Sequence, residues 1–256
     1  MTTAKNNFPA ALLLLIGVLM FTGCSTKPVK PKGEDIIPPD FPADRVLGEA
    51  LEYRQATGIS DPWEGFNRTV FRFNYRFDKY LFLPVVRAYQ AVAPDIVETG
   101  IHNFRRNVDD VTTLVNSILQ LSFEKTMNTA TRLMVNSTIG LAGFINVASD
   151  VPRSDEDFGQ TLGHWGVGTG PFLVLPILGP SNVRDGIGLG VDYYIIMGIC
   201  DWVFNLESWQ SWTWTAIAAI DIRAHTAFRY YETGSPFEYE WVRVLYTTKR
   251  KLDVER

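Results

Sequence analysis

The sequence predicts an all-α protein held at a membrane surface, with one irregular glycine-rich segment at its centre. Three observations favour this class. Apolar residues recur at helical spacing over several long stretches. Residues that start and stop helices bound those stretches. Between them, residues 158–190 carry glycines and prolines that disfavour both a central strand and a spanning helix.

The amino terminus is typical of an export signal. Residues 1–23 contain a lysine, then an apolar run too short to cross a bilayer, and Thr22 and Gly23 lie directly before Cys24. This junction resembles the lipobox of bacterial lipoproteins, in which the cysteine becomes the acylated first residue. Phe21 stands where leucine is usual, so a plain signal peptide is the alternative.

Composition and cysteine content limit the classes of protein to which the chain can belong. The net charge of −4 and the isoelectric point near 5.5 argue against sequence-independent nucleic-acid binding. Cys24 and Cys200 are the only cysteines, so acylation of Cys24 leaves no disulfide. Acyl chains are then the expected anchor, and no cofactor is indicated. Ser25 after the cysteine resembles the sorting signal for the outer membrane.

The next residues predict a tether and then a folded domain. Residues 24–60 include a proline-rich stretch of mixed charge, typical of an extended linker. We place the helical domain at residues 61–252. Its first helix, about 62–83, opens at Asp61-Pro62-Trp63-Glu64, a variant of the capping box with Asp61 as the predicted N-cap.

That first helix is apolar on two opposite faces. Phe66, Val70, Phe73, Phe77 and Tyr80 share one face, and Phe71, Tyr75 and Phe82 the other. Such a helix is buried on both sides, or buried on one and in contact with lipid on the other. A basic stripe runs between the faces, and it either meets lipid phosphates or is an ordinary solvated face, which we favour. Its members are Arg68, Arg72, Arg76 and Lys79.

Further helices are predicted along the chain. Pro84 should end or kink the first helix. Residues 95–121 then form an amphipathic helix, and residues 124 to about 139 form another. The longer helix carries its apolar residues at helical spacing, namely Phe104, Val108, Val111, Leu114, Val115, Ile118 and Leu119.

The glycine-rich segment at 158–190 contains the apolar run Pro171–Leu178. An apolar segment without regular structure is stable only inside protein or where protein meets lipid. A buried loop in an ordinary helical domain is the alternative. We take this segment as the candidate channel or gate element, in particular Phe158, Gly159, Gly163, His164, Trp165, Gly166, Gly168 and Gly170.

The last third of the chain is apolar and rich in tryptophan. Residues 186–206 contain Asp192 and Asp201, which makes a membrane span unfavourable. A tryptophan cluster follows at the head of a helix reaching about Tyr231, and it marks either a membrane interface or an ordinary core. Ser235-Pro236-Phe237-Glu238 predicts a capping box for the final helix.

Motifs for catalysis and metal binding are not evident. His102, His164 and His225 lie far apart in the sequence without metal-ligand spacing, so no metal site is predicted. There is no hydrolase elbow, dinucleotide fingerprint or P-loop. His164 is the one histidine in the glycine-rich segment, and a structural role for it is favoured over a catalytic one.

Taken together, these stretches resemble the MlaA (VacJ) lipoprotein family over about residues 60–250. The 158–186 motif is long and ordered, and therefore specific. The sequence departs from the family pattern at Ser235-Pro236-Phe237, where members commonly have Asp-Pro-Tyr. The resembling pieces are Asp61–Arg68, Asn103-Phe104, Asn116, Phe158–Gly168, Gly170-Pro171, Leu175-Pro176, Gly179–Ser181, Arg184–Gly186, Arg223-Ala224, Arg243 and Tyr246.

The resemblance implies a ring of amphipathic helices around a channel, monotopic in the periplasmic leaflet of the outer membrane. It implies removal of mislocalised phospholipids from the outer leaflet and their transfer to a soluble periplasmic carrier, beside a trimeric porin. Two other classes stay open: a structural lipoprotein that scaffolds porins, and a lipid hydrolase or acyltransferase using His164 with Asp157 or Asp185.

Overall fold

The structure is a computed structural model, and it describes residues 58–205, 207–232 and 234–255. The predicted signal peptide, Cys24 and nearly all of the tether lie outside these residues. Within them, helices predominate and a single two-stranded sheet occurs. The elements are α3 (Glu64–Phe77), η1 (Asp78–Phe82), α4 (Leu83–Val92), α5 (Asp95–Leu119), α6 (Phe123–Thr138), α7 (Phe158–His164), β1 (Phe172–Leu175), β2 (Gly179–Asn182), α8 (Val183–Phe204), α9 (Ser208–Ala224) and α10 (Glu238–Glu255).

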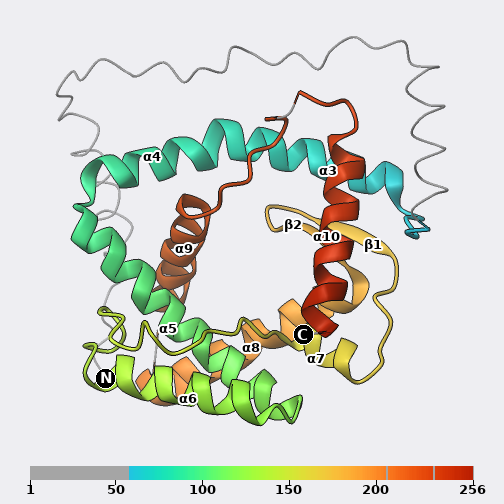
Figure 1. Cartoon of the computed structure of the whole chain (residues 1–256). Coiled ribbons are helices and arrows are strands. Elements are labelled where there is room, and N and C mark those ends of the chain that lie inside the picture. The colour runs from blue at the N-terminus through green and yellow to red at the C-terminus, as the bar shows by residue number, and fades with distance from the viewer. Residues whose placement is uncertain (1–57, 206, 233, 256) are drawn as a thin grey trace, which may run out of the picture. The chain divides into compact units, whose positions relative to one another are not determined.

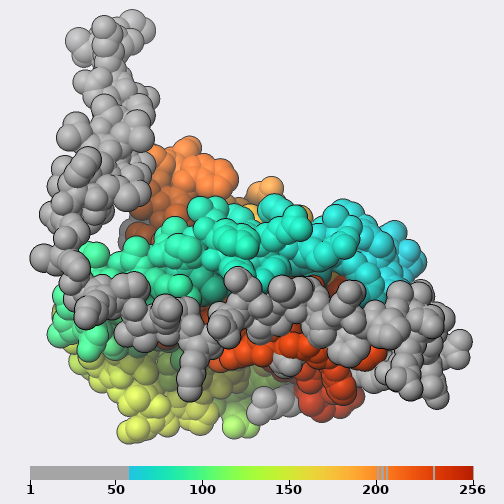
Figure 2. Space-filling view, turned by 90° about the horizontal axis from the view of Figure 1, so that it is seen from above, coloured from blue at the N-terminus to red at the C-terminus, as the bar shows by residue number. Residues whose placement is uncertain are grey.

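The described helices surround a central region and do not stack in layers (Figure 1). The rod α3–η1–α4 forms one side, α5 the next, α7 with α8 the third and α10 the fourth, while α9 and the hairpin lie further inward. Figure 2, seen from above, shows the rod as a continuous green-to-cyan band across this face. Packing joins α5 to α6, α7 to α8 and α4 to α9. The predicted all-α fold with a ring of helices is therefore confirmed.

The start and the end of the first helix differ from prediction. Trp63 is the N-cap residue, without a side-chain cap bond. Asp61 is buried and instead accepts hydrogen bonds from Asn67 and from Tyr239 of α10. At Pro84 the helical path continues through the π turn η1 into α4. Because proline lacks an N–H and collides with the carbonyl four residues earlier, a widened turn before it relieves both problems.

The interior of this unit is mainly polar. α5 buries Asn107, Asp110, Thr113, Asn116 and Ser117, whereas its apolar stripe is only partly buried, and Ile118 of that stripe is 52% exposed. The predicted helix is confirmed, and the side chains that it buries are polar ones. Hydrogen bonds between elements explain why these polar side chains lie inside.

Asn116 links three elements through such bonds. Its amide donates to Asp192 of α8 at 2.9 Å and accepts from the hydroxyl of Thr161 in α7 at 2.8 Å. Asn107 likewise donates to Ser137 of α6 at 3.0 Å. Buried polar groups are stable only when they are paired in this way. A network between helices therefore takes the place that an apolar core has elsewhere.

The glycine-rich segment is more regular than predicted. It forms α7, the hairpin β1–β2 and the start of α8. Phe172 and Val174 of β1 are almost fully buried, so the run judged unfit for a core strand contains one. Asn67 and Asn74 of α3 bond the outer edge of β1, accepting from Val174 and Ile177 and donating to Phe172 and Leu175. These side chains make the backbone hydrogen bonds that a neighbouring strand would otherwise make.

The later helices also differ in detail. α9 ends at Ala224, earlier than the predicted Tyr231. In the second predicted capping box, the Ser235 hydroxyl accepts from the backbone N–H of Phe237, and the Glu238 carboxylate accepts from that of Tyr231. This contact fixes the connection that returns the chain to the hairpin and α3. Around it, Val70, Phe71, Phe172, Val174, Tyr239 and Val242 form the one small apolar core among the described residues.

Candidate functional site

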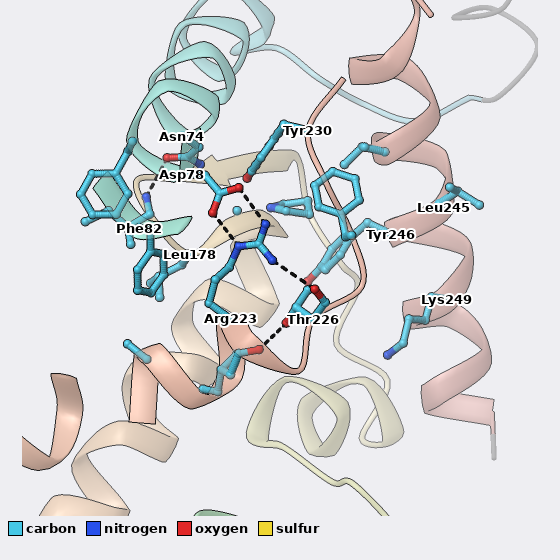
Figure 3. A pocket seen from close by; sticks show the side chains of 18 residues that line it. Asn74, Asp78, Phe82, Leu178, Arg223, Thr226, Tyr230, Leu245, Tyr246 and Lys249 are labelled. Atoms are coloured by element: carbon cyan, nitrogen blue, oxygen red, sulfur yellow. Dashed lines mark hydrogen bonds and ion pairs between the residues drawn. The ribbon is translucent and has the colours of Figure 1, made fainter. Parts of the chain in front are cut away.

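A pocket of about 480 Å³ lies inside the frame of helices. Its walls come from the end of α3 with η1, the hairpin turn, the carboxyl end of α9, and α10 (Figure 3). Most of the lining is apolar, and it includes Phe77, Phe82, Leu178, Phe228 and Leu245. An apolar cavity with a few fixed polar groups is the usual form of a small-molecule site.

One buried ion pair supplies the polar part of the pocket. The guanidinium of Arg223 donates twice to the Asp78 carboxylate, Nε to Oδ1 at 2.5 Å and Nη2 to Oδ2 at 2.7 Å. Its third nitrogen donates to the carbonyl of Thr226 at 3.1 Å, as Figure 3 shows. Bidentate pairing fixes both side chains, and the apolar walls strengthen their field.

Other polar groups lie around this pair. Burial, and after it the Asp78 charge, raises the pKa of Tyr230 to about 12, so its hydroxyl stays neutral at pH 7. Lys249 of α10 borders the pocket, and its ammonium pairs with Asp253 at 2.7 Å. The pocket therefore holds one paired internal charge and a basic residue at its margin.

The hairpin turn is the part of the glycine-rich segment that lines the pocket, through Ile177 to Pro180. The residues we predicted as the gate lie elsewhere. Phe158, Gly159, Gly163 and His164 belong to α7, and Trp165, Gly166, Gly168 and Gly170 to the loop before β1. The candidate gate residues do not include this turn. Its signal in the sequence is the Gly179-Pro180 dipeptide, which is typical of turns.

The basic stripe separates into two groups. Arg68 is paired with Glu64 and Glu240, and its guanidinium lies 4.4 Å from the ring centre of Tyr239. Lys79 lies over the rings of Tyr75 and Tyr80. Arg72 and Arg76 are exposed. The structure therefore does not gather these cations at the pocket, and their predicted phosphate contacts stay a prediction.

A second network occupies the carboxylates that we had considered for catalysis. Arg250 of α10 donates to both oxygens of Asp157, at 2.7 and 2.8 Å, and to Asp185 at 2.7 Å. Burial alone would raise the pKa of each carboxyl, but the Arg250 hydrogen bonds and charge outweigh it, so both pKa values are lowered. His164 is exposed, and neither carboxylate pairs with it. This network ties α7, α8 and α10 together.

Two of the three histidines, by contrast, lie side by side. The rings of His102 and His225 are stacked with centroids 3.8 Å apart, and both contact the buried carboxylate of Asp221. Their wide separation in the sequence does not predict this contact. Burial has the largest effect on the pKa of His102 and lowers it. The contacts with Asp221 act in the opposite direction, but they do not cancel this effect, so the pKa stays below its usual value.

The outer surface carries large apolar side chains. The predicted tryptophan cluster consists of Trp202, Trp209, Trp212 and Trp214, and two of these side chains, Trp202 and Trp212, are 87% and 70% exposed and are therefore not core residues. Exposed apolar residues occur on nearly every helix and in the turns between them, among them Phe66, Phe73, Tyr80, Ile96, Leu121, Phe123, Met134, Ile139 and Tyr194. A surface this rich in apolar groups marks contact with lipid or with protein. None of the described helices is sufficiently long and apolar to pass through a membrane.

Comparisons with known proteins agree on one family. Residues 59–253 match the MlaA lipoprotein family. The chain is 36% identical to the intermembrane phospholipid transport system lipoprotein MlaA of Escherichia coli K12 over 171 residues, 64% of this chain and 68% of that protein. It is 43% identical to an uncharacterized protein of Rickettsia felis, over 50% of this chain and 51% of the relative. The chain thus spans about half the length of the Rickettsia relatives that it matches.

A solved structure agrees as well. It comes from work described as the structural basis for maintenance of bacterial outer membrane lipid asymmetry, and it superposes with a TM-score of 0.61 at 31% identity. The match covers 76% of this chain and 99% of that one. The frame of helices, the hairpin and the central pocket are therefore found in a chain that belongs to the MlaA lipoprotein family.

Proposed function

We propose that this protein removes phospholipids mislocalised in the outer leaflet of the outer membrane and passes them to a soluble periplasmic carrier, which maintains lipid asymmetry. The names of its relatives support this proposal, since the Escherichia coli and Haemophilus influenzae proteins are intermembrane phospholipid transport lipoproteins. The solved structure that superposes on this chain supports the proposal too, because its description concerns the maintenance of bacterial outer membrane lipid asymmetry. We infer transport without catalysis, because Asp157 and Asp185 are held by Arg250.

We further propose that the protein is anchored by acyl chains on Cys24 and lies monotopically in the periplasmic leaflet, beside a trimeric porin. The exposed aromatic and aliphatic side chains support this placement, since they would be hydrated in water. The polar interior supports it as well. A protein whose surface is in lipid gains little from turning its apolar side chains inward.

The observation that carries the proposal is the central pocket with its Asp78–Arg223 pair. At about 480 Å³ it is smaller than a whole diacyl phospholipid, so the acyl tails must extend beyond it. The fixed charges offer partners to a zwitterionic or anionic headgroup, and the apolar walls fit methylene chains. Such a pocket handles an amphipathic molecule without any bond being made or broken.

A blocked pocket tests this. Ala219 and Ala216 both lie on α9, but only Ala219 lines the pocket, and Ala216 is exposed. Ala219→Trp should therefore reduce transfer of labelled phospholipid from vesicles to a periplasmic carrier several-fold, while Ala216→Trp should not. Helix content by circular dichroism must be the same for both variants.

The same assay separates the alternatives. If Ala219→Trp transfers phospholipid at the rate of the unmodified protein, the pocket does not lie on the lipid pathway. Release of free fatty acid would indicate a hydrolase instead. Porin binding without any lipid transfer by the unmodified protein would favour the scaffold class.

A further inference from the structure

A cluster outside the pocket has the donor atoms of a metal site. It joins three residues: His102 of α5, Asp221 in the last turn of α9, and His225 directly after that helix. Each contributes one ligand atom, and the three atoms lie within 4.8 Å of one another. Imidazole and carboxylate groups suit zinc and neighbouring divalent transition metals.

The distances within the cluster fit a shared ion. The Nδ1 atom of His102 lies 3.1 Å from one Asp221 oxygen, and the Nδ1 atom of His225 lies 3.2 Å from the other. In a tetrahedral zinc site, bonds of about 2.0–2.1 Å place neighbouring ligand atoms roughly 3.3 Å apart. Small adjustments would let both nitrogens and one oxygen bind the same ion.

Charge and access are also favourable. Asp221 is 1% exposed, and it pairs with Arg105, whose charge is balanced in turn by Asp109. The group formed by Arg105, Asp109 and Asp221 therefore keeps a net negative charge for a cation. His225 is 36% exposed in its side chain, which opens the cluster to solvent, although its Nδ1 atom also lies 2.9 Å from the Asp221 carbonyl oxygen and must be released from it to bind an ion.

We propose that His102, Asp221 and His225 form a binding site for Zn²⁺ or a similar divalent transition metal, which joins α5 to the end of α9. Three protein ligands leave a fourth position for water. Asp221 lies two residues before Arg223, so a bound ion would stiffen the helix end that carries the pocket's ion pair. The proposal stands independently of lipid transport.

The test uses full-length protein in detergent, without a polyhistidine tag and stripped of metal with a chelator. Titration with Co²⁺ should give the saturable visible absorption of a tetrahedral site, which Zn²⁺ should abolish. Zn²⁺ at about one hundred times its Kd should raise Tm by about 5–10 °C. His225→Ala, at an exposed position, and His102→Ala should each lose both effects.

His164→Ala is the matched control, since His164 is exposed and outside the cluster. It should bind Co²⁺ as the unmodified protein does. Absence of saturable binding would overturn the proposal. Binding that persists in His102→Ala and His225→Ala would place the metal elsewhere and overturn it equally, and circular dichroism must show that His225→Ala is folded.

Discussion

Two glycines of α8, Gly188 and Gly190, should respond oppositely to the same change. Gly188 is buried where α8 crosses α7. A Cβ atom there would lie 2.7 Å from the Cα atom of Gly159 and closer still to its nitrogen. At Gly190 the added carbon would have no neighbour within 4 Å among the described residues, apart from the adjoining residues and the backbone of its own helix turn. Alanine therefore meets backbone at one position and open space at the other.

The magnitudes follow from helix propensity and packing. In a helix interior, alanine is more favourable than glycine by about 0.5–1 kcal/mol. Gly190→Ala should raise the free energy of unfolding by that amount. Gly188→Ala has the same gain, but forcing two backbones apart costs about 1–3 kcal/mol. Its net effect should be a loss of up to about 2.5 kcal/mol, centred on about 1 kcal/mol, and Tm should move by roughly 2–4 °C per kcal/mol.

Thermal unfolding in detergent, followed by far-ultraviolet circular dichroism, measures both variants. The expected result is a higher Tm for Gly190→Ala and a lower Tm for Gly188→Ala. Equal shifts in the same direction would refute the steric argument, because propensity alone predicts stabilisation at both positions.

Two further changes address other parts of the molecule. Arg250→Gln removes the partner that lowers the pKa of Asp157 and Asp185. Carboxyls with a lowered folded pKa stabilise the fold above their unfolded value of about 4 and lose that contribution as pH falls. The variant should thus be less stable by about 3 kcal/mol at pH 7. Urea unfolding at pH 7 and at low pH checks that this difference shrinks in acid; a constant difference would contradict the pairing. Gly168→Val adds a side chain where nothing lies within 4 Å and φ is not positive, so stability should hold. If the loop gates the lipid path, transfer between vesicles and carrier should change several-fold, and unchanged transfer would make the loop structural.

Helix positions could be read from the sequence, but the direction of their faces could not. Residues 95–121 were predicted as a helix and form α5 at Asp95–Leu119. Its spacing marks an apolar face, yet the side chains that the fold buries are polar ones such as Asn107, Asp110 and Asn116. A 3.6-residue period shows that two faces differ, and which face turns inward depends on the surrounding solvent. The sequence of one helix does not show whether the solvent around it is water or lipid.

Contacts between segments that are distant in the sequence also could not be predicted. The Asp78–Arg223 pair and the His102–His225 stack each join residues from opposite ends of the domain. No local spacing marks them, because their geometry arises from the closure of the helices around the pocket. The motif at 158–186, in contrast, identified the family because its residues are continuous in the chain.

The polar interior also sets how stability should vary with temperature. The heat capacity change on unfolding grows with newly hydrated apolar area and is reduced by newly hydrated polar area. Among the described residues, the buried side chains are mostly polar or charged, and many apolar ones are already outside. Unfolding from detergent or lipid into water would hydrate those outer groups, whereas unfolding within the apolar phase would not. The curvature of the stability curve should therefore report the surrounding phase more than the packing of the fold.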